Sequence, residues 1–207
     1  MRNLFIRLFI FAVTAAVAPS VLAQQPIYTT LGPGGIFDTS NPVQIVSGGL
    51  DGYADLFTSP VTANVFSVSL ALEAVSPGAG VDVSLREDTD GLPGALVHLF
   101  TSSPLPAEPG ITTFVSATDF QINAGTQYWL TAVTSAGKAD WFYNNQGIDN
   151  PIATREANIW SAGQVDGPAL AFQINPAPEP GSLALCSLGI ASLFFVRRLK
   201  TRVPRIA

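Results

Sequence analysis

The chain has 207 residues, of which 47% are apolar and only 12% are charged, whereas soluble proteins average about 25% charged residues. This length fits one domain that can bury a substantial core. The single cysteine, Cys186, excludes a disulfide framework and a Cys-based zinc cluster, and the single histidine, His98, leaves little material for a His-rich metal site.

The charged residues are unevenly distributed along the chain. Most of the ten Lys and Arg residues lie near the two ends. Residues 24–177 hold only three bases, Arg86, Lys138 and Arg155, against fourteen acids, which gives this body a net charge of −11. Recognition of phosphates requires Lys and Arg, so we expect no nucleic-acid partner.

Residues 1–23 have the organisation of a secretory signal peptide. Arg2 and Arg7 provide the positive start, and an apolar core follows at 8–17. Small residues then lead up to Ala23, where signal peptidase is predicted to cut. Because the apolar run is short for a membrane span, we expect cleavage rather than an N-terminal anchor.

The C-terminal end has three parts in order. A Pro-rich linker at 176–181 precedes an uncharged run at 182–196, and a basic tail follows, beginning with Arg197, Arg198 and Lys200. Basic residues stay on the cytoplasmic side of a membrane, so this tail places the body outside, as the signal peptide also does. We therefore predict a single C-terminal transmembrane helix within the sorting segment 182–207.

This end resembles the PEP-CTERM sorting signal. Pro178, Glu179 and Pro180 match its tripeptide, the run at 182–196 its short hydrophobic segment, and Arg197–Arg198 its basic stop. In that family exosortase, a membrane-embedded cysteine transpeptidase-like enzyme, recognises the signal and cuts near the motif. The bearers are mostly Gram-negative bacteria that make exopolysaccharide. The resemblance implies exosortase and signal peptidase as partners, a transient inner-membrane anchor, and delivery to the cell surface or extracellular matrix.

The body at 24–175 shows short alternating apolar runs separated by Gly, Pro, Asn and Asp, which is typical of an all-β domain. The expected strands lie at 43–46, 61–75, 81–86, 95–101, 111–117, 128–134, 139–143 and 170–174. Phe66, Val68 and Leu70 are expected to point to one face of their strand, and 144–168 is expected to form long loops. The spacing predicts an antiparallel β-sandwich of the jelly-roll kind.

Three stretches of the body resemble the choice-of-anchor group of bacterial surface domains, most closely the type labelled R. They are Thr62–Glu73, Val81–Leu99 with its acidic turn, and Phe120–Ala132. The resemblance covers roughly residues 40–150. It implies a β-sandwich and a cell-surface setting, and it brings no catalytic residues to this chain.

The acidic turn that contains Asp88 and Asp90 is a weak calcium candidate, because alternating oxygen ligands suit that ion. The spacing fails for an EF-hand, since Arg86 and Val97 fall on the first and last ligand positions. A solvated hairpin turn is the favoured interpretation, and we predict no cofactor.

Trp141, Tyr143 and Asn144 are the best candidates for a sugar contact. The aromatic rings offer flat apolar faces for a pyranose, and the amide offers hydrogen bonds. The favoured alternative places most of the aromatic residues in the core, as expected for Trp129 in its apolar strand.

Catalysis finds little support in the sequence. There is no G-x-S-x-G motif, and a Ser–His–Asp triad would have to use His98, which we expect to be a strand histidine with a structural hydrogen bond. We predict an exported, non-enzymatic surface or matrix protein associated with exopolysaccharide. The alternatives are a carbohydrate-binding module and, as the weaker one, a secreted hydrolase with a carboxylate pair.

Overall fold

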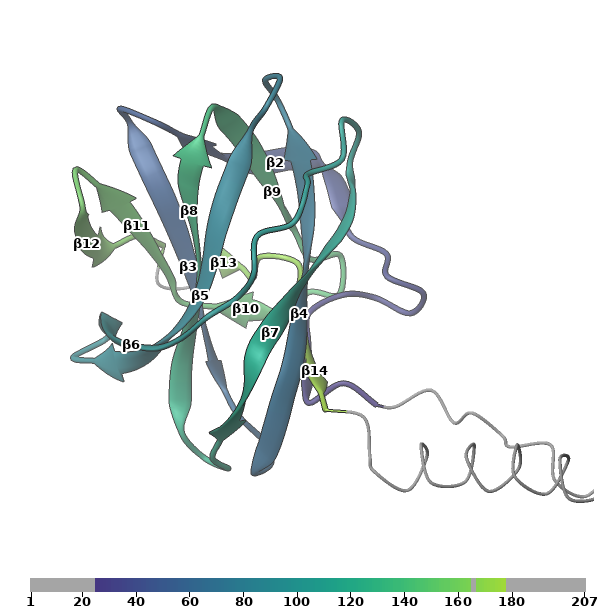
Figure 1. The fold of residues 1–207 in the computed structure, drawn as a ribbon, viewed down its shortest axis with the longest axis vertical. Helices are drawn as coiled ribbons and strands as arrows, with labels where there is room; N and C mark the ends of the chain where they lie inside the picture. The colour runs from purple at the N-terminus through teal and green to yellow at the C-terminus, as the bar shows by residue number, and fades with distance from the viewer. Residues whose placement is uncertain (1–24, 165–166, 178–207) are drawn as a thin grey trace, which may run out of the picture. The chain divides into compact units, whose positions relative to one another are not determined.

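The computed structural model describes residues 25–164 and 167–177, which form strands and turns and no helix (Figure 1). These residues belong to one compact unit, Gln24–Ala177. The predicted signal peptide, the motif at 178–180 and the C-terminal helix lie outside the described residues. Within the described part of the chain, no helix has the length and hydropathy needed to span a membrane.

Two six-stranded antiparallel sheets make up most of the fold. The first sheet contains β1 (Tyr28–Thr29), β14 (Phe172–Pro176), β4 (Ala63–Ala74), β9 (Lys138–Tyr143) and β2 (Asp38–Val46) in that order, with β7 (Gly110–Ile122) also paired to β4. The second sheet runs in the order β12 (Ile159–Ala162), β11 (Ile152–Glu156), β3 (Leu50–Thr58), β8 (Gln127–Ala136), β5 (Gly80–Thr89) and β6 (Leu92–Leu99). A short pair joins β10 (Asp149–Asn150) to β13 (Gly167–Pro168). The prediction of an all-β antiparallel fold is confirmed, and the arrangement is consistent with a β-sandwich.

The core draws apolar side chains from both sheets. Alternate residues of a strand point to opposite faces, so each strand can give one set of side chains to the interior. The largest core cluster includes Ile45, Val68, Leu72, Trp141 and Phe172 from the first sheet, and Phe57, Val83, Leu85 and Leu130 from the second. Full burial of one such side chain contributes about 1.5–3 kcal/mol, so this cluster is the main source of stability.

The expected alternation is wrong at one end of β4. The pairing register between β4 and β7 shifts between Val65 and Ser67. As a result Val65 is buried and Phe66 is 41% exposed, so Phe66 does not share the face of Val68 and Leu70. A register irregularity of this kind turns side chains to the other face, and sequence alternation alone does not reveal it.

The sequence did not predict β3, although this strand lies between β8 and β11 in the second sheet. Its apolar pattern is interrupted by Gly52 and Asp55. A Cβ atom at Gly52 would lie 2.9 Å from a methyl carbon of Val133 on β8, so close strand packing requires glycine there. The strands β11 and β12 also replace part of the expected loop at 144–168.

Two tight hairpins complete the second sheet. Asp90 and Gly91 connect β5 to β6 with φ angles of 53° and 78°, and Ala157 and Asn158 connect β11 to β12 with φ angles of 48° and 69°. Two-residue connections with both φ angles positive are type I′ turns, whose twist matches that of the flanking strands. The predicted acidic turn is therefore a hairpin turn, only two residues long.

Candidate functional site

Trp141 lies in the core and offers no surface to a sugar. It is fully buried on β9, and its Nε1 donates a hydrogen bond to the Ala171 carbonyl over 3.1 Å. Tyr143, two residues further along β9, is half-buried and packs against the main core cluster. The hypothesis of a sugar platform at these rings is therefore wrong for Trp141, and the alternative of a core role is confirmed for it.

Asn144 has a structural role in the loop that follows β9. Its Nδ2 donates to the carbonyls of Ile148 and Ala169, each over 2.8 Å. Its Oδ1 accepts from the backbone N–H groups of Gln146 and Ile148. Because these bonds occupy both ends of a buried amide, Asn144 is not available as a sugar contact.

The two acids of the calcium candidate do not converge on a common point. Asp88 accepts a hydrogen bond from Nε1 of Trp129 over 2.7 Å, whereas Asp90 is exposed in the hairpin turn. Among the described residues, no three His, Cys, Asp or Glu side chains come together to hold a metal ion. The visible role of Asp88 is to fix the Trp129 indole.

His98 lies beside a serine, and both side chains have further contacts within the fold. Its Nε2 is 2.8 Å from Oγ of Ser116, and the Ser116 hydroxyl donates to the Thr118 carbonyl. Which of Nε2 and Oγ donates in the His98–Ser116 bond depends on the tautomer of His98. The ring also stacks on Phe120 with 4.0 Å between centroids, and burial lowers the pKa of His98. This is the structural hydrogen bond that the sequence predicted.

The outer face of the second sheet, which points away from the main core, is partly covered by its own edges. Trp129 points to this face from β8 and is nevertheless only 1% exposed. Leu92 of β6 and Trp160 of β12 pack against it. The edge strands β6 and β12 also contact each other, and Figure 1 shows both at the same side of the molecule. The second sheet therefore curls so that two hairpins close over its middle strands.

The curl of the β5–β6 hairpin has a local cause. The pairing register shifts on both sides of Arg86, and such bulges bend a strand and increase its twist. Gly94 lies opposite on β6, where a Cβ atom would come within 2.0 Å of Oγ1 of Thr89. The bend thus depends on a glycine at this position.

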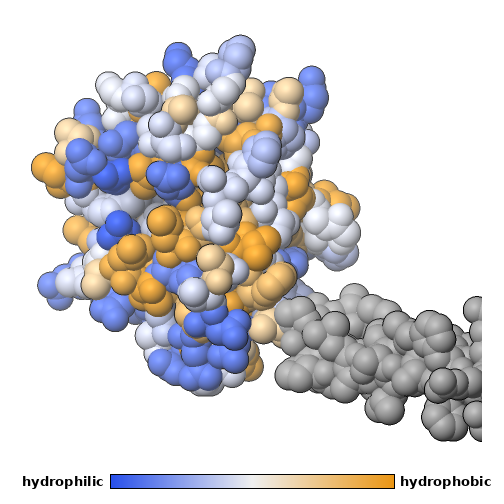
Figure 2. All heavy atoms as spheres, viewed as in Figure 1, coloured by the Kyte–Doolittle hydropathy of each residue, from blue (hydrophilic) through white to orange (hydrophobic). Residues whose placement is uncertain are grey.

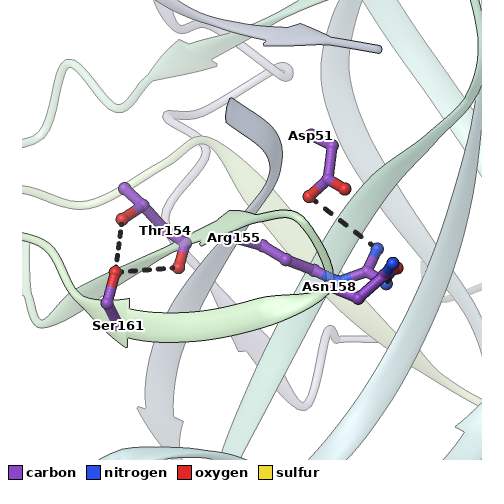
Figure 3. Close-up of polar contacts among 5 residues, drawn as sticks. All are labelled: Asp51, Thr154, Arg155, Asn158 and Ser161. Atoms are coloured by element: carbon purple, nitrogen blue, oxygen red, sulfur yellow. Dashed lines mark hydrogen bonds and ion pairs between the residues drawn. The ribbon is translucent and has the colours of Figure 1, made fainter. Parts of the chain in front are cut away.

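Arg155 points to the same outer face from β11 and is held by several contacts (Figure 3). Its Nη2 donates to Oδ1 of Asn158, and its Nη1 lies 4.0 Å from Oδ1 of Asp51. The guanidinium also lies 5.9 Å from the ring centroid of Trp160. The hairpin is closed further by Oγ atoms of Thr154 and Ser161, 3.3 Å apart. These contacts fix the direction of a long side chain that would otherwise be mobile.

Arg86 approaches the same place from the opposite side of the curled sheet. Its Nη1 donates to the Gly94 carbonyl over 2.8 Å, while its Nε is buried without a hydrogen-bond partner among the described residues. Burial lowers the pKa of Arg86, and the like charge of Arg155 lowers it further. We call Arg86, Trp129, Arg155 and Trp160 the outer-face cluster. Figure 2 shows hydrophilic and hydrophobic side chains mixed over the face of the body that it presents.

The sequence-based predictions assigned no binding role to Arg86 or Arg155. A signal for their importance was nevertheless present, because they are two of the three bases in residues 24–177. Their meeting depends on the curl of the second sheet, which no local pattern encodes.

A buried carboxylate was also missed. Asp55 of β3 is fully buried on the inner face and accepts hydrogen bonds from the Leu170 N–H and from Nδ2 of Asn150, each over 2.7 Å. Asn150 in turn donates to the Tyr28 hydroxyl over 3.1 Å. Burial raises the pKa of Asp55 to about 8, although both hydrogen bonds act in the opposite direction. Because the group has no exposed surface, it serves the fold rather than a reaction.

A scan against models of known protein families gives no match to this chain, and a search of curated proteins finds no relative.

Proposed function

We propose that this chain is an exported, non-enzymatic surface or extracellular-matrix protein of a Gram-negative bacterium, sorted and processed through a PEP-CTERM signal and associated with exopolysaccharide. The observation that carries the proposal is the order of the C-terminal features. The last strand, β14, ends at Pro176, and the Pro178-Glu179-Pro180 motif, the apolar run and the basic tail follow in sequence. A short Pro-rich linker would hold the cleavage site clear of the folded body.

For the body we infer a jelly roll. The strand order β2-β9-β4-β7 in the first sheet and β3-β8-β5-β6 in the second supports this topology. The remaining short strands and β11, β12 and β14 extend this eight-stranded plan. The jelly roll is shared by many lectin and capsid domains, so it suits a binding role but does not assign one.

A binding role is favoured over catalysis by the polar side chains of the body. In the Ser116–His98 pair, the serine hydroxyl also contacts the Thr118 carbonyl and the His98 ring stacks on Phe120, so both side chains are held by the fold. Asp55, whose pKa is raised most clearly, is sealed inside the core. The outer-face cluster of the second sheet contains two arginines, which bind anions rather than transfer protons.

The sorting proposal is tested by mass spectrometry of the exported protein. We expect the wild-type chain to lack residues 1–23 and everything much beyond Pro180. Glu179→Gln should remain uncut and accumulate in the inner membrane. Glu108→Gln makes the same chemical change in an exposed loop and should be processed like the wild type. An intact C-terminus on exported wild-type protein would refute processing.

The outer-face cluster favours a carbohydrate-binding module as a second candidate function. Its half-buried indole, Trp160, lies beside a fixed guanidinium, whereas the aromatic residue first considered, Trp141, is in the core. Glycan binding that depends on Trp160 would support this candidate.

A further inference from the structure

We propose that Arg86 and Arg155 bind the carboxylate of an acidic sugar, such as a uronic acid unit of a polysaccharide, at the outer face of the second sheet. The site specifies which class of polysaccharide the protein would bind. It rests on the proposed function only in one respect, namely that the carboxylate belongs to a sugar.

The few bases of the body are unevenly placed. Residues 24–177 hold three bases and fourteen acids. Two of these bases, Arg86 and Arg155, project onto the same outer face from strands separated by β3 and β8, and the edge strands β6 and β12 of this sheet contact each other. The like charge of Arg155 also lowers the pKa of Arg86. Like charges repel, and they are brought together in proteins where an anion between them compensates.

Arg86 has unused hydrogen-bonding capacity. Within the described residues, the ion pair of Arg155 with Asp51 is the one present, and Arg86 has no carboxylate within ion-pair distance. Among the described residues the guanidinium donates one hydrogen bond, to the Gly94 carbonyl, and its buried Nε has no partner there. A buried charged donor without a partner is costly, and a bound oxyanion would reduce that cost by compensating the charge.

The guanidinium of Arg155 is already held in a fixed orientation. A guanidinium presents a planar fork of donors that matches a carboxylate, and here Asn158 and Trp160 already fix its orientation. Asp51 competes for it, but its Oδ1 is 4.0 Å away, beyond hydrogen-bond distance, and has no partner of its own. The side chains of Arg155 and Asp51 each keep 19% of their surface exposed, so a ligand can approach from solvent.

Apolar side chains in the cluster indicate which kind of molecule carries the carboxylate. Trp160 lies beside Arg155, and Trp160 and Leu92 add apolar surface to the cluster around Trp129. A free inorganic anion would gain nothing from an indole, and a neutral sugar would gain nothing from two positive charges. A pyranose ring that carries a carboxylate matches both features, since it has an apolar face and an anionic edge. The other acid close to the site, Asp88, is already bound to Trp129.

The test is a titration of the full chain, purified in a nonionic detergent, with sodium D-glucuronate, followed by calorimetry. D-glucose and sodium acetate serve as the neutral ring and the ringless carboxylate. We expect glucuronate to bind with a Kd of about a millimolar, and both controls at least about tenfold more weakly. Arg155→Gln and Arg86→Gln should each weaken glucuronate binding by about tenfold or more. Lys138→Gln removes the same charge from the exposed end of β9 and should bind within about twofold of the wild type.

Equal binding of glucose and glucuronate, or wild-type affinity in both arginine variants, would overturn the proposal. Equal binding of acetate would overturn the assignment to a sugar. Thermal melting shows whether each variant is folded. If Arg155→Gln is unfolded, Arg155→Lys decides, because it keeps the charge, loses the fork, and should still bind more weakly. If the wild-type chain binds no glucuronate while its exported form is correctly cut, this inference fails and the sorting proposal stands.

Discussion

Asp55 is an ionisable group without access to water, and this makes the fold sensitive to pH. Burial raises its pKa from the ordinary 3.8 to about 8, so the folded state holds the proton more tightly than the unfolded chain. Its contribution to stability is therefore full below about pH 4 and is lost as the pH rises through about 8.

We accordingly expect the Tm to fall between about pH 5 and pH 9, and to fall less in Asp55→Asn, because an amide mimics the protonated acid. The Asn150 side chain can rotate to present its oxygen to the new amide. Exposed Asp82 on β5 provides the control, since Asp82→Asn should retain the wild-type slope. The comparison requires thermal melting of the three proteins at several pH values. If the Tm of Asp55→Asn fell with pH as steeply as that of the wild type, the pH dependence would not come from Asp55.

Two residues explain why the sequence did not predict β3. Its propensity is lowered by Gly52 and Asp55, and both are explained only by tertiary contacts, with Val133 in one case and with Asn150 and Leu170 in the other. By contrast, the strand at 128–134 was predicted because its β-prone residues form a continuous run, as expected for a strand that is buried on both faces.

At the scale of elements, the β11–β12 hairpin presents Arg155 and Trp160 through a turn that its sequence does not favour. Ala157 occupies the first turn position with a φ of 48°. The left-handed conformation costs an L-residue about 1 kcal/mol, and glycine avoids that cost while gaining entropy in the unfolded chain.

Ala157→Gly should therefore stabilise the protein by about 0.5 kcal/mol. Ala162→Gly, at the paired end of β12, has no such strain to relieve and should destabilise by about 0.5–1 kcal/mol. Urea unfolding of both variants against the wild type measures the difference. A loss of stability in both would mean that the turn does not strain Ala157.

The outer-face cluster could not be predicted for a reason that also belongs to elements. Period-two alternation assigns Trp129 to a face of β8, but it does not say whether that face meets solvent. Coverage by Leu92 and Trp160 follows from bulges and turns in two separate hairpins. The Asp90–Gly91 turn was visible in the sequence, but the bend around Arg86 was not.

At the scale of the whole molecule, the excess of acids adds a second source of pH dependence to that of Asp55. A body with a net charge of −11 repels itself, and its repulsion grows as carboxylates ionise. Surface repulsion is screened by salt, because the Debye length falls from about 30 Å at 0.01 M to about 8 Å at 0.15 M. A fully buried group such as Asp55 is screened much less.

Salt should therefore separate the two contributions. At pH 9 we expect the Tm to rise by about 2–5 °C between 0.01 M and 0.15 M NaCl, and to rise more in Lys138→Gln, whose body carries one further negative charge. The difference in pH slope between the wild type and Asp55→Asn should persist at both salt concentrations, since it arises inside the core. A Tm that does not respond to salt would show that the acids lie too far apart to destabilise the body. If salt instead abolished the effect of Asp55→Asn, the pH dependence would belong to the surface charges.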